Sequence, residues 1–198
     1  RNKKEFNQRF EKLIELNADL HVDFMDGHFV RARGIKTSDV PNLIKNKIKF
    51  EAHLMSLNPE EYIDRLKAKG FDKIIFHYEA INRSQILKLI DKIKANKMQV
   101  WIAINPSTKI NRILEFLNKL DGVLFMGVFP GKEHKKFVNK VYEKIMKLKK
   151  INKKIKIQVD GGVNIKIAKK LGKLGVNYAN SGSFISDSKN PREALWEL

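Results

Sequence analysis

The stretch "DLHVDFMDGHFV" (Asp19–Val30) alternates apolar residues with His21, Asp23 and Met25. Residues two apart in a β-strand share a face, so a strand here would point a histidine, a carboxylate and a thioether in one direction. The same alternation recurs in "EAHLM" (51–55), which places a second histidine beside a second methionine. The two segments predict two short strands that each carry chemically useful side chains on one face.

Short apolar runs alternate with longer amphipathic runs along the chain, a pattern typical of repeated βα units around a parallel sheet. The predicted strands are Leu20–Met25, Phe50–Met55, Lys73–Tyr78, Gln99–Ile104, Gly122–Val128, Ile155–Asp160 and Tyr178–Ile185. The predicted helices are Pro59–Lys69, Arg83–Asn96, Lys109–Leu120, His134–Lys153 and Asn164–Leu174. No linker or low-complexity segment interrupts this order, so we expect residues 1–198 to form a single domain.

A helix-like segment, "EFNQRFEKLIELN" (5–17), comes before the first predicted strand, and only "RNKK" precedes it. In a βα unit each helix follows a strand. Seven strands plus one missing at the N-terminus predict a (β/α)8 TIM barrel, with "NPREALWEL" (190–198) as the last helix. We therefore expect the chain to be incomplete at its start. An open dinucleotide-binding sheet is the alternative, but no G-x-G-x-x-G turn is found.

The composition excludes several classes of protein. Cysteine is absent, so the chain offers no disulfide, thiolate metal site or cysteine nucleophile. No apolar run reaches the length of a membrane span, which predicts a cytoplasmic protein. The formal charge is +18, from 40 basic and 22 acidic residues. Because the lysines follow helical spacing, we expect them on solvated helix faces; such a surface attracts phosphorylated small molecules, and nucleic acid is not the expected partner.

Four metal-binding side chains are predicted at the C-terminal ends of strands, where barrel active sites are built. They are His21, Asp23, His53 and Asp160, the last of which precedes two glycines in "IQVDGGV". Imidazole and carboxylate together suit a divalent cation, and zinc, iron(II), manganese and cobalt all fit such a set. A single strand histidine is usually structural, so the prediction depends on four such residues at equivalent strand ends.

The chain resembles the ribulose-phosphate 3-epimerase family in a series of segments at successive strand ends. These are "HVDFMDGHFV", "AHLM" followed by "NPEEYI", "IIFHYEA", "AINPST", "VLFMGVFPG", and "IQVDGGVN" with "NSGSF". The resemblance implies a (β/α)8 barrel of the ribulose-phosphate-binding type. It also implies metal-dependent epimerisation at C3, between D-ribulose 5-phosphate and D-xylulose 5-phosphate, in the pentose phosphate pathway.

The resemblance also assigns roles to individual residues. Asp23 and Asp160 would be an acid/base pair that inverts the carbon through an enediolate, one carboxylate on each face. Both would also be metal ligands, together with His21 and His53. Substrate-binding roles fall on His53, Met25, Met55, Met126, Gly131, Gly161, Gly162, Gly182 and Ser183.

Two glycine-containing segments are expected to bind the phosphate, because the loops after the last two strands of this fold commonly do so. "DGGV" offers the amides of Gly161 and Gly162, and "NSGSF" offers Gly182 and Ser183. One loop departs from the family pattern. After Gly131 a glycine-rich stretch is usual, whereas this chain has "KEHKK" (132–136), which leaves open whether the loop closes on substrate.

Three functions remain open at this point. Ribulose 5-phosphate epimerisation comes first, and allulose-6-phosphate 3-epimerase, which would use the same ligand set, comes second. The third is a catalytically degenerate, basic polyanion-binding barrel. Related decarboxylases are disfavoured, since their Asp-x-Lys-x-x-Asp signature is absent where "DFMDG" stands. The sequence does not fix the metal, the substrate length or the oligomeric state, and a homo-oligomer is left open.

Overall fold

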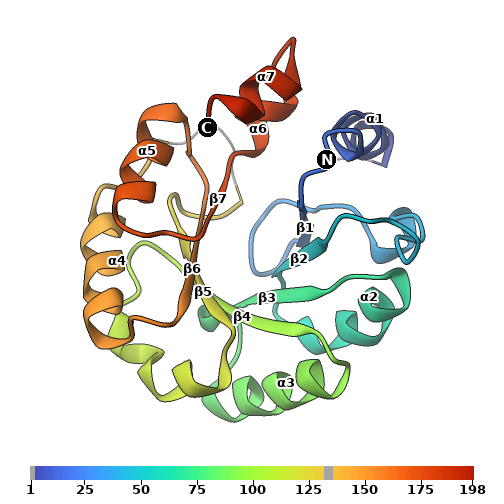
Figure 1. The fold of residues 1–198 in the computed structure, drawn as a ribbon. Helices are drawn as coiled ribbons and strands as arrows, with labels where there is room; N and C mark the ends of the chain where they lie inside the picture. Colours follow the sequence, from blue (N-terminus) through green and yellow to red (C-terminus); the bar gives the residue numbers. More distant parts are fainter. Residues whose placement is uncertain (1–2, 132–135) are drawn as a thin grey trace. The chain divides into compact units, whose positions relative to one another are not determined.

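Strands and helices alternate along the computed structural model, which describes residues 3–131 and 136–198 (Figure 1). The strands are β1 (Leu20–Met25), β2 (Phe50–Met55), β3 (Lys73–His77), β4 (Gln99–Ile104), β5 (Gly122–Met126), β6 (Lys156–Asp160) and β7 (Tyr178–Asn180). The α-helices are α1 (Lys3–Ile14), α2 (Ile63–Lys69), α3 (Arg83–Ala95), α4 (Lys140–Ile151), α5 (Ile165–Lys173), α6 (Gly182–Ser186) and α7 (Pro191–Trp196). Short 3₁₀ helices are η1 (Thr37–Asp39), η2 (Pro59–Tyr62), η3 (Tyr78–Ala80), η4 (Ile110–Arg112) and η5 (Leu114–Lys119).

The strands follow one another in the sheet in sequence order. β1 pairs with β2, β2 with β3, β5 with β6 and β6 with β7, and all four pairs are parallel. Parallel neighbours need a crossover connection, which helices provide in most of these steps. The prediction of an α/β fold with successive βα units is therefore confirmed.

Two compact units divide the chain, Arg1–Trp101 and Ile102–Leu198. The first contains α1 to α3 and β1 to β3, and the second contains β5 to β7 and α4 to α7. The boundary falls within β4. The expectation that residues 1–198 form a single domain stays a prediction.

In the first unit, β1 separates an apolar face from a polar one. Phe24 is fully buried, and its ring lies 5.9 Å from Phe71 and 6.1 Å from Tyr62. His21 and Asp23 alternate with Phe24 and so point to the opposite face. Burial of large aromatic side chains on one face holds the strand in place, and the polar side chains are thereby directed to the other.

Helix α3 shows how the sequence fixes the helices. Its buried residues, Ile86, Leu89, Ile90 and Ile93, follow the spacing of one helical face. At its start, the Asn82 side chain accepts a hydrogen bond from the backbone N–H of Gln85, and the Gln85 side chain accepts one from the N–H of Asn82. This reciprocal cap satisfies backbone donors that the first turn leaves unpaired, and it sets where the helix begins.

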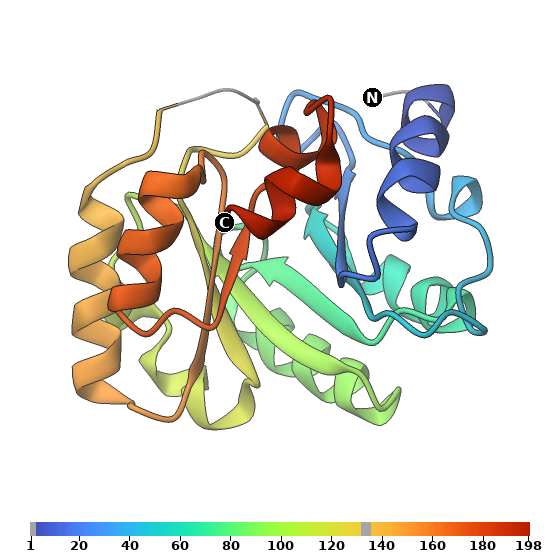
Figure 2. The ribbon, with the colours of Figure 1, turned by 45° about the horizontal axis from the view of Figure 1, so that its top comes forward.

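In the second unit, α4 and α5 lie side by side on one side of β6 (Figure 2). Val141, Ile145 and Leu148 form the buried stripe of α4. The ammonium of Lys170 on α5 lies 3.8 Å from the ring centroid of Tyr142 on α4, a cation–π contact between the two helices. The other face of each helix carries lysines and is exposed, as the helical spacing of the lysines predicted.

Most predicted elements are confirmed, and three differ. Residues 109–120 form the 3₁₀ helices η4 and η5 instead of an α-helix. Their buried residues Ile110, Ile113 and Phe116 are three apart, which matches the three residues per turn of a 3₁₀ helix. The predicted strand 178–185 ends at Asn180, because the Ser181 hydroxyl bonds the Val163 carbonyl and α6 starts at the next residue.

The third difference is the helix predicted at His134–Lys153, which the structure gives as α4 from Lys140. Residues 136–139 are not helical, and 132–135 lie outside the described residues. Within residues 3–131 and 136–198, no helix is both long enough and apolar enough to span a membrane.

Candidate functional site

The parallel register of β1 and β2 brings the first unit's candidate residues together. His21 lies beside Glu51, Asp23 beside His53, and Met25 beside Met55. Side chains paired in this way across neighbouring strands share one face of the sheet. The alternation in the sequence therefore becomes two adjacent rows of functional side chains.

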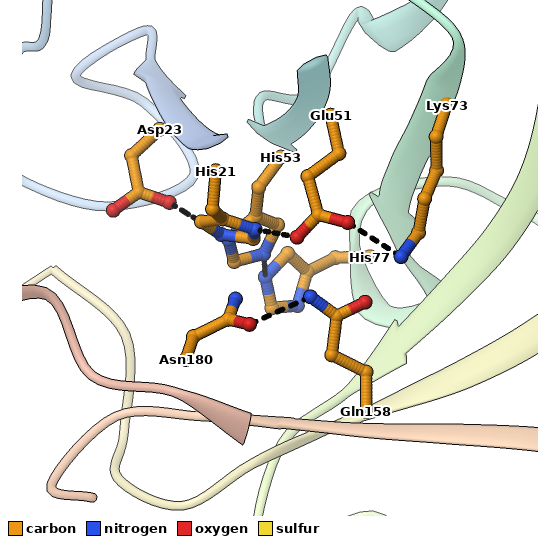
Figure 3. Close-up of polar contacts among 8 residues, drawn as sticks. All are labelled: His21, Asp23, Glu51, His53, Lys73, His77, Gln158 and Asn180. Carbon is orange, nitrogen blue, oxygen red and sulfur yellow. Dashed lines mark hydrogen bonds and ion pairs between the residues drawn. The ribbon is translucent and has the colours of Figure 1, made fainter. Parts of the chain in front are cut away.

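Three potential ligand atoms of the first unit converge on one point (Figure 3). Nε2 of His21 lies 3.3 Å from Nδ1 of His53 and 3.2 Å from Oδ1 of Asp23, and Nδ1 of His53 lies 2.9 Å from the same oxygen. Ligands bonded at about 2.0–2.1 Å in a tetrahedral zinc site lie roughly 3.3 Å from one another. The donor types and the spacing thus fit three ligands of a divalent cation.

Glu51 supports the outer nitrogen of His21. Its Oε1 lies 2.5 Å from Nδ1 of His21, and its Oε2 lies 2.5 Å from the ammonium of Lys73. Burial raises the pKa of Glu51, but the charges of His21 and Lys73 and their hydrogen bonds lower it further, to about 2. Glu51 is therefore a carboxylate, and a carboxylate behind an imidazole is a common arrangement at metal sites.

His21 lies between two carboxylates. Burial lowers its pKa, but the charges of Glu51 and Asp23 and the hydrogen bonds to both raise it more, so that the pKa lies well above 6.5. For Asp23, burial raises the pKa, whereas hydrogen bonds and charge interactions with His21 and His53 lower it more, so that the pKa lies below its usual range. This environment favours positive charge at Nε2 of His21, where a proton and a metal ion compete for one lone pair.

His53 is held from behind by His77. Nε2 of His53 lies 2.9 Å from Nε2 of His77, and Nδ1 of His77 lies 3.2 Å from a carboxylate oxygen of Glu79. If His53 uses Nδ1 toward a metal, its proton sits on Nε2 and is donated to His77, which in turn donates from Nδ1 to Glu79. Burial lowers the pKa of His77 to about 4, which agrees with a neutral acceptor.

Asp26, in the same motif, has a structural role. Its carboxylate accepts hydrogen bonds from the backbone N–H groups of His28, Phe29 and Leu57, at 2.7–2.9 Å. Burial raises the pKa of Asp26, and these backbone donors lower it more, so that the pKa lies below its usual range. Asp26 therefore ties the loop after β1 to the loop after β2.

The second unit holds the remaining candidates. Asp160 is the last residue of β6, in register with Met126 at the end of β5 and with Asn180 at the end of β7. The N–H of Gly127 donates to the Asp160 carbonyl at 2.6 Å. A Cβ added at Gly127 would lie 2.3 Å from the Gly161 carbonyl, so the close approach of the two strand ends requires glycine.

The glycines predicted to bind phosphate occupy two different conformations. Gly161 and Gly162 have φ of +95° and +69°, in the left-handed region that favours glycine. Gly182 and Ser183 are the first two residues of α6, where backbone N–H groups point out of the helix. Gly131 also has a positive φ, +89°, and the altered loop beyond it (132–135) lies outside the described residues.

The three candidate methionines also lie in both units, each at the end of a strand. Met25 and Met55 end β1 and β2 as a register pair, and Met126 ends β5. Met55 and Met126 are each 3 % exposed. Their thioethers contribute apolar, polarizable surface at the strand ends.

The sequence reasoning missed four side chains that support the site: Glu51, Lys73, His77 and Glu79. A signal for two of them was present. Glu51 alternates with His53, and His77 ends the third strand in "IIFHYEA", so both belong to the face that carries the ligands. Lys73 gave no such signal, because a lysine at the start of a strand usually reaches solvent.

A sequence model of the Ribulose-phosphate 3 epimerase family matches residues 2–186. The chain belongs to the ribulose-phosphate 3-epimerase family. It is 32 % identical over 189 residues to ribulose-phosphate 3-epimerase of Schizosaccharomyces pombe, covering 93 % of this chain and 82 % of the relative. It is 33 % identical over 193 residues to the cytoplasmic isoform of Oryza sativa, covering 95 % of this chain and 84 % of the relative. The chain is therefore an epimerase of carbohydrates.

Solved structures confirm the fold predicted for this epimerase family member. A crystal structure of 3-hexulose-6-phosphate synthase superimposes with a TM-score of 0.70 at 18 % identity and covers 96 % of this chain and 90 % of its own. At that identity the structural similarity shows only the fold, which is α/β of the TIM-barrel type. Membership of the family also confirms the resemblance on which the assigned roles of individual residues rest.

Proposed function

We propose that this protein epimerises D-ribulose 5-phosphate and D-xylulose 5-phosphate at C3, with one divalent metal ion. Membership of the ribulose-phosphate 3-epimerase family supports the substrate class. The observation that carries the proposal is the convergence of Nε2 of His21, Nδ1 of His53 and Oδ1 of Asp23 within 3.3 Å of one another. We propose Asp160 as the fourth ligand, because it ends a parallel strand of the same fold and is itself a carboxylate.

Two carboxylates would move the protons. The hydrogen next to a ketone is weakly acidic, and a bound divalent ion would act as a Lewis acid that stabilises negative charge on the ketone oxygen. Asp23 would remove or return the proton on one face of the substrate, and Asp160 would do so on the other. His77 and Glu51 would hold the imidazoles of His53 and His21, so that the ligand nitrogens stay aimed at the site.

The remaining predicted residues would bind the substrate. Met25, Met55 and Met126 would cover the reacting carbons with unprotonated surface, and His53 would lie beside them. Gly161, Gly162, Gly182 and Ser183 would bind the phosphate through backbone amides, since the loops after the last strands of this fold often do. We also propose that residues 1–198 act as one barrel domain, because the family match extends across both units. Cytoplasmic location and homo-oligomerisation stay predictions.

The decisive experiment is an assay of the purified protein, freed of metal and then supplied separately with Zn²⁺, Fe²⁺, Mn²⁺ or Co²⁺. Ribulose 5-phosphate and allulose 6-phosphate are compared as substrates, with elemental analysis of the bound metal. We expect about one metal ion per chain and turnover of the five-carbon substrate. Preference for allulose 6-phosphate would favour the six-carbon epimerase instead. Absence of turnover with every metal would contradict the proposal.

One observation favours a second activity, the binding of polyanions. Between residues 136 and 175 the sequence has thirteen lysines and two acidic residues, and most of these lysines are exposed on or near α4 and α5. Such a surface is expected to bind nucleic acid weakly and with a steep salt dependence, whether or not the enzyme is active. Polyanion binding without turnover would identify a degenerate barrel, and turnover excludes that alternative.

A further inference from the structure

A row of three polar side chains crosses the first three strands (Figure 3). The register places His21 of β1 beside Glu51 of β2, and Glu51 beside Lys73 of β3. The two contacts within the row, His21 Nδ1 to Glu51 Oε1 and Lys73 Nζ to Glu51 Oε2, both measure 2.5 Å. Because the backbone register fixes the order of the row, Glu51 connects Lys73 to the proposed metal ligand His21.

The two oxygens of Glu51 serve different partners. One accepts from the imidazole of His21 and the other from the ammonium of Lys73. A glutamate side chain has one more rotatable bond than an aspartate, so a second anchor narrows the directions in which its carboxylate can point. The contact with Lys73 therefore determines where the Glu51 oxygen lies relative to Nδ1 of His21.

Lys73 is itself held in place. Its side chain is 9 % exposed, and its ammonium lies 3.7 Å from the ring centroid of Trp101. A lysine that only balanced charge would keep its ammonium in water. The ammonium is instead enclosed between an aromatic face and a carboxylate, two groups that together restrict it to one position.

We propose that Lys73 is a positioning residue of the metal site, acting through Glu51. By holding the Glu51 carboxylate, Lys73 keeps the Nδ1–H of His21 directed at Glu51 and leaves Nε2 of His21 directed at the metal. This inference rests on the proposed function, since it requires that His21 is a metal ligand. It assigns Lys73 no contact with substrate.

The first test measures Zn²⁺ affinity by competition with a chelating dye, using the full chain and variants that circular dichroism shows to be folded. Lys73→Met is expected to weaken Zn²⁺ binding about 10- to 100-fold, the usual effect of losing a group that supports a metal ligand. Lys92→Met is the matched control, because Lys92 forms an ion pair with Asp64 at 3.0 Å and both side chains are exposed. Lys73→Arg, which keeps the positive charge, is expected to restore most of the affinity.

A double-mutant cycle tests whether Lys73 acts through Glu51. If it does, Glu51→Gln combined with Lys73→Met binds Zn²⁺ no more weakly than Glu51→Gln alone. This double variant also removes the buried carboxylate that has lost its contact with Lys73, so it remains informative if Lys73→Met alone does not fold. Additive losses of affinity would overturn the proposed route.

Nuclear magnetic resonance of the imidazole nitrogens gives a readout independent of affinity. In Zn²⁺-loaded wild-type protein, we expect His21 as a single species with a protonated Nδ1 and a metal-bound Nε2. In Lys73→Met we expect exchange broadening or a second species. Wild-type Zn²⁺ affinity and an unchanged His21 spectrum in Lys73→Met would overturn the role of Lys73 but leave the proposed function intact. Failure of wild-type protein to bind any divalent metal would instead overturn the metal site of the proposed function.

Discussion

Each unit contains a pair of polar side chains that joins two neighbouring strands, and the two pairs differ in charge (Figure 3). In the first unit, Lys73 and Glu51 form an ion pair at 2.5 Å. In the second, the side-chain amide of Gln158 donates to the carbonyl oxygen of Asn180 at 2.8 Å. Both pairs are at least partly withdrawn from water, yet the first requires two charges to be desolvated and the second requires none.

The difference indicates what each pair does. A buried ion pair adds little stability relative to apolar residues of the same size, because desolvation of both charges offsets their attraction. A neutral amide pair has a smaller desolvation penalty, although the Nδ2 of Asn180 is buried without a hydrogen-bond partner among the described residues. An ion pair beside the proposed ligand His21 is therefore better explained by its effect on the site than by its effect on the fold. The amide pair is adequately explained by the packing of β6 and β7.

The largest expected effect concerns the proposed carboxylate of each unit, Asp23 and Asp160. Replacing either with asparagine keeps the size but removes the base, so kcat should fall by roughly 10²- to 10⁴-fold, and further where the metal is also lost. Metal loss should be greater for Asp23→Asn, because Asp23 contacts both imidazoles. Steady-state kinetics with measured metal content check both expectations.

Solvent deuterium separates the roles of the two carboxylates. In a given direction, a variant that keeps the proton-removing base can exchange deuterium into unreacted substrate without inverting the carbon. Asp64→Asn on the exposed surface of α2 serves as the control and should keep wild-type kinetics. Near-normal epimerisation by both Asp23→Asn and Asp160→Asn with metal bound would refute the two-base mechanism.

The next effect concerns the contribution of the Lys73–Glu51 ion pair to the stability of the first unit. Lys73→Met leaves the Glu51 charge buried beside His21, and we expect a loss of about 3–5 kcal/mol in the free energy of unfolding. Adding Glu51→Gln removes that charge and should recover a large part of the loss. Urea denaturation of the metal-free proteins measures both values. A loss below about 1 kcal/mol in Lys73→Met would show that the carboxylate is readily solvated and that the pair is not a buried one.

The pH dependence of stability tests the neutral histidine of the first unit. The pKa of His77 is lowered to about 4, against 6.5 in the unfolded chain. Between these values the unfolded state binds the additional proton, so stability falls as pH falls from about 6.5 to 4. His77 should contribute about 3 kcal/mol to the loss between pH 7.5 and pH 4, and this contribution should disappear in His77→Gln.

His21 and Glu51 also change the stability with pH, but they do so above about pH 6.5 and below about pH 4.5. His21, with its raised pKa, is protonated in both states below pH 6.5, and its contribution is lost only as pH rises toward its folded pKa. Glu51, with its pKa near 2, contributes stability that is lost as pH falls below about 4.5. The difference between wild type and His77→Gln isolates His77. Equal pH slopes in the two proteins would mean that His77 is not held neutral.

The sequence placed the proposed ligands on shared strand faces, but it missed the groups that support them. Alternation alone places His21 with Asp23, and His53 with Met55, because a strand has a fixed period of two. Which residues of different strands become neighbours depends on the register, and the His21–Glu51 contact could not be predicted without it. The end of β7 was missed for a similar reason. The apolar residues Phe184 and Ile185 continue a strand-like pattern, whereas the turn at Ser181 starts a helix.

The smallest expected effect belongs to the amide pair of the second unit. Gln158→Met is close to isosteric and removes the amide that donates to Asn180, whose side-chain oxygen then lacks that partner. We expect a loss of about 1–2 kcal/mol in the free energy of unfolding, in the lower part of the range for an unsatisfied buried group, because Asn180 is only half-buried. Zn²⁺ affinity should not change, since no ligand nitrogen is held by this pair. If Gln158→Met destabilised the protein as much as Lys73→Met, or weakened metal binding equally, the charge of the first pair would have no special role. Both polar pairs would then serve only to pack neighbouring strands.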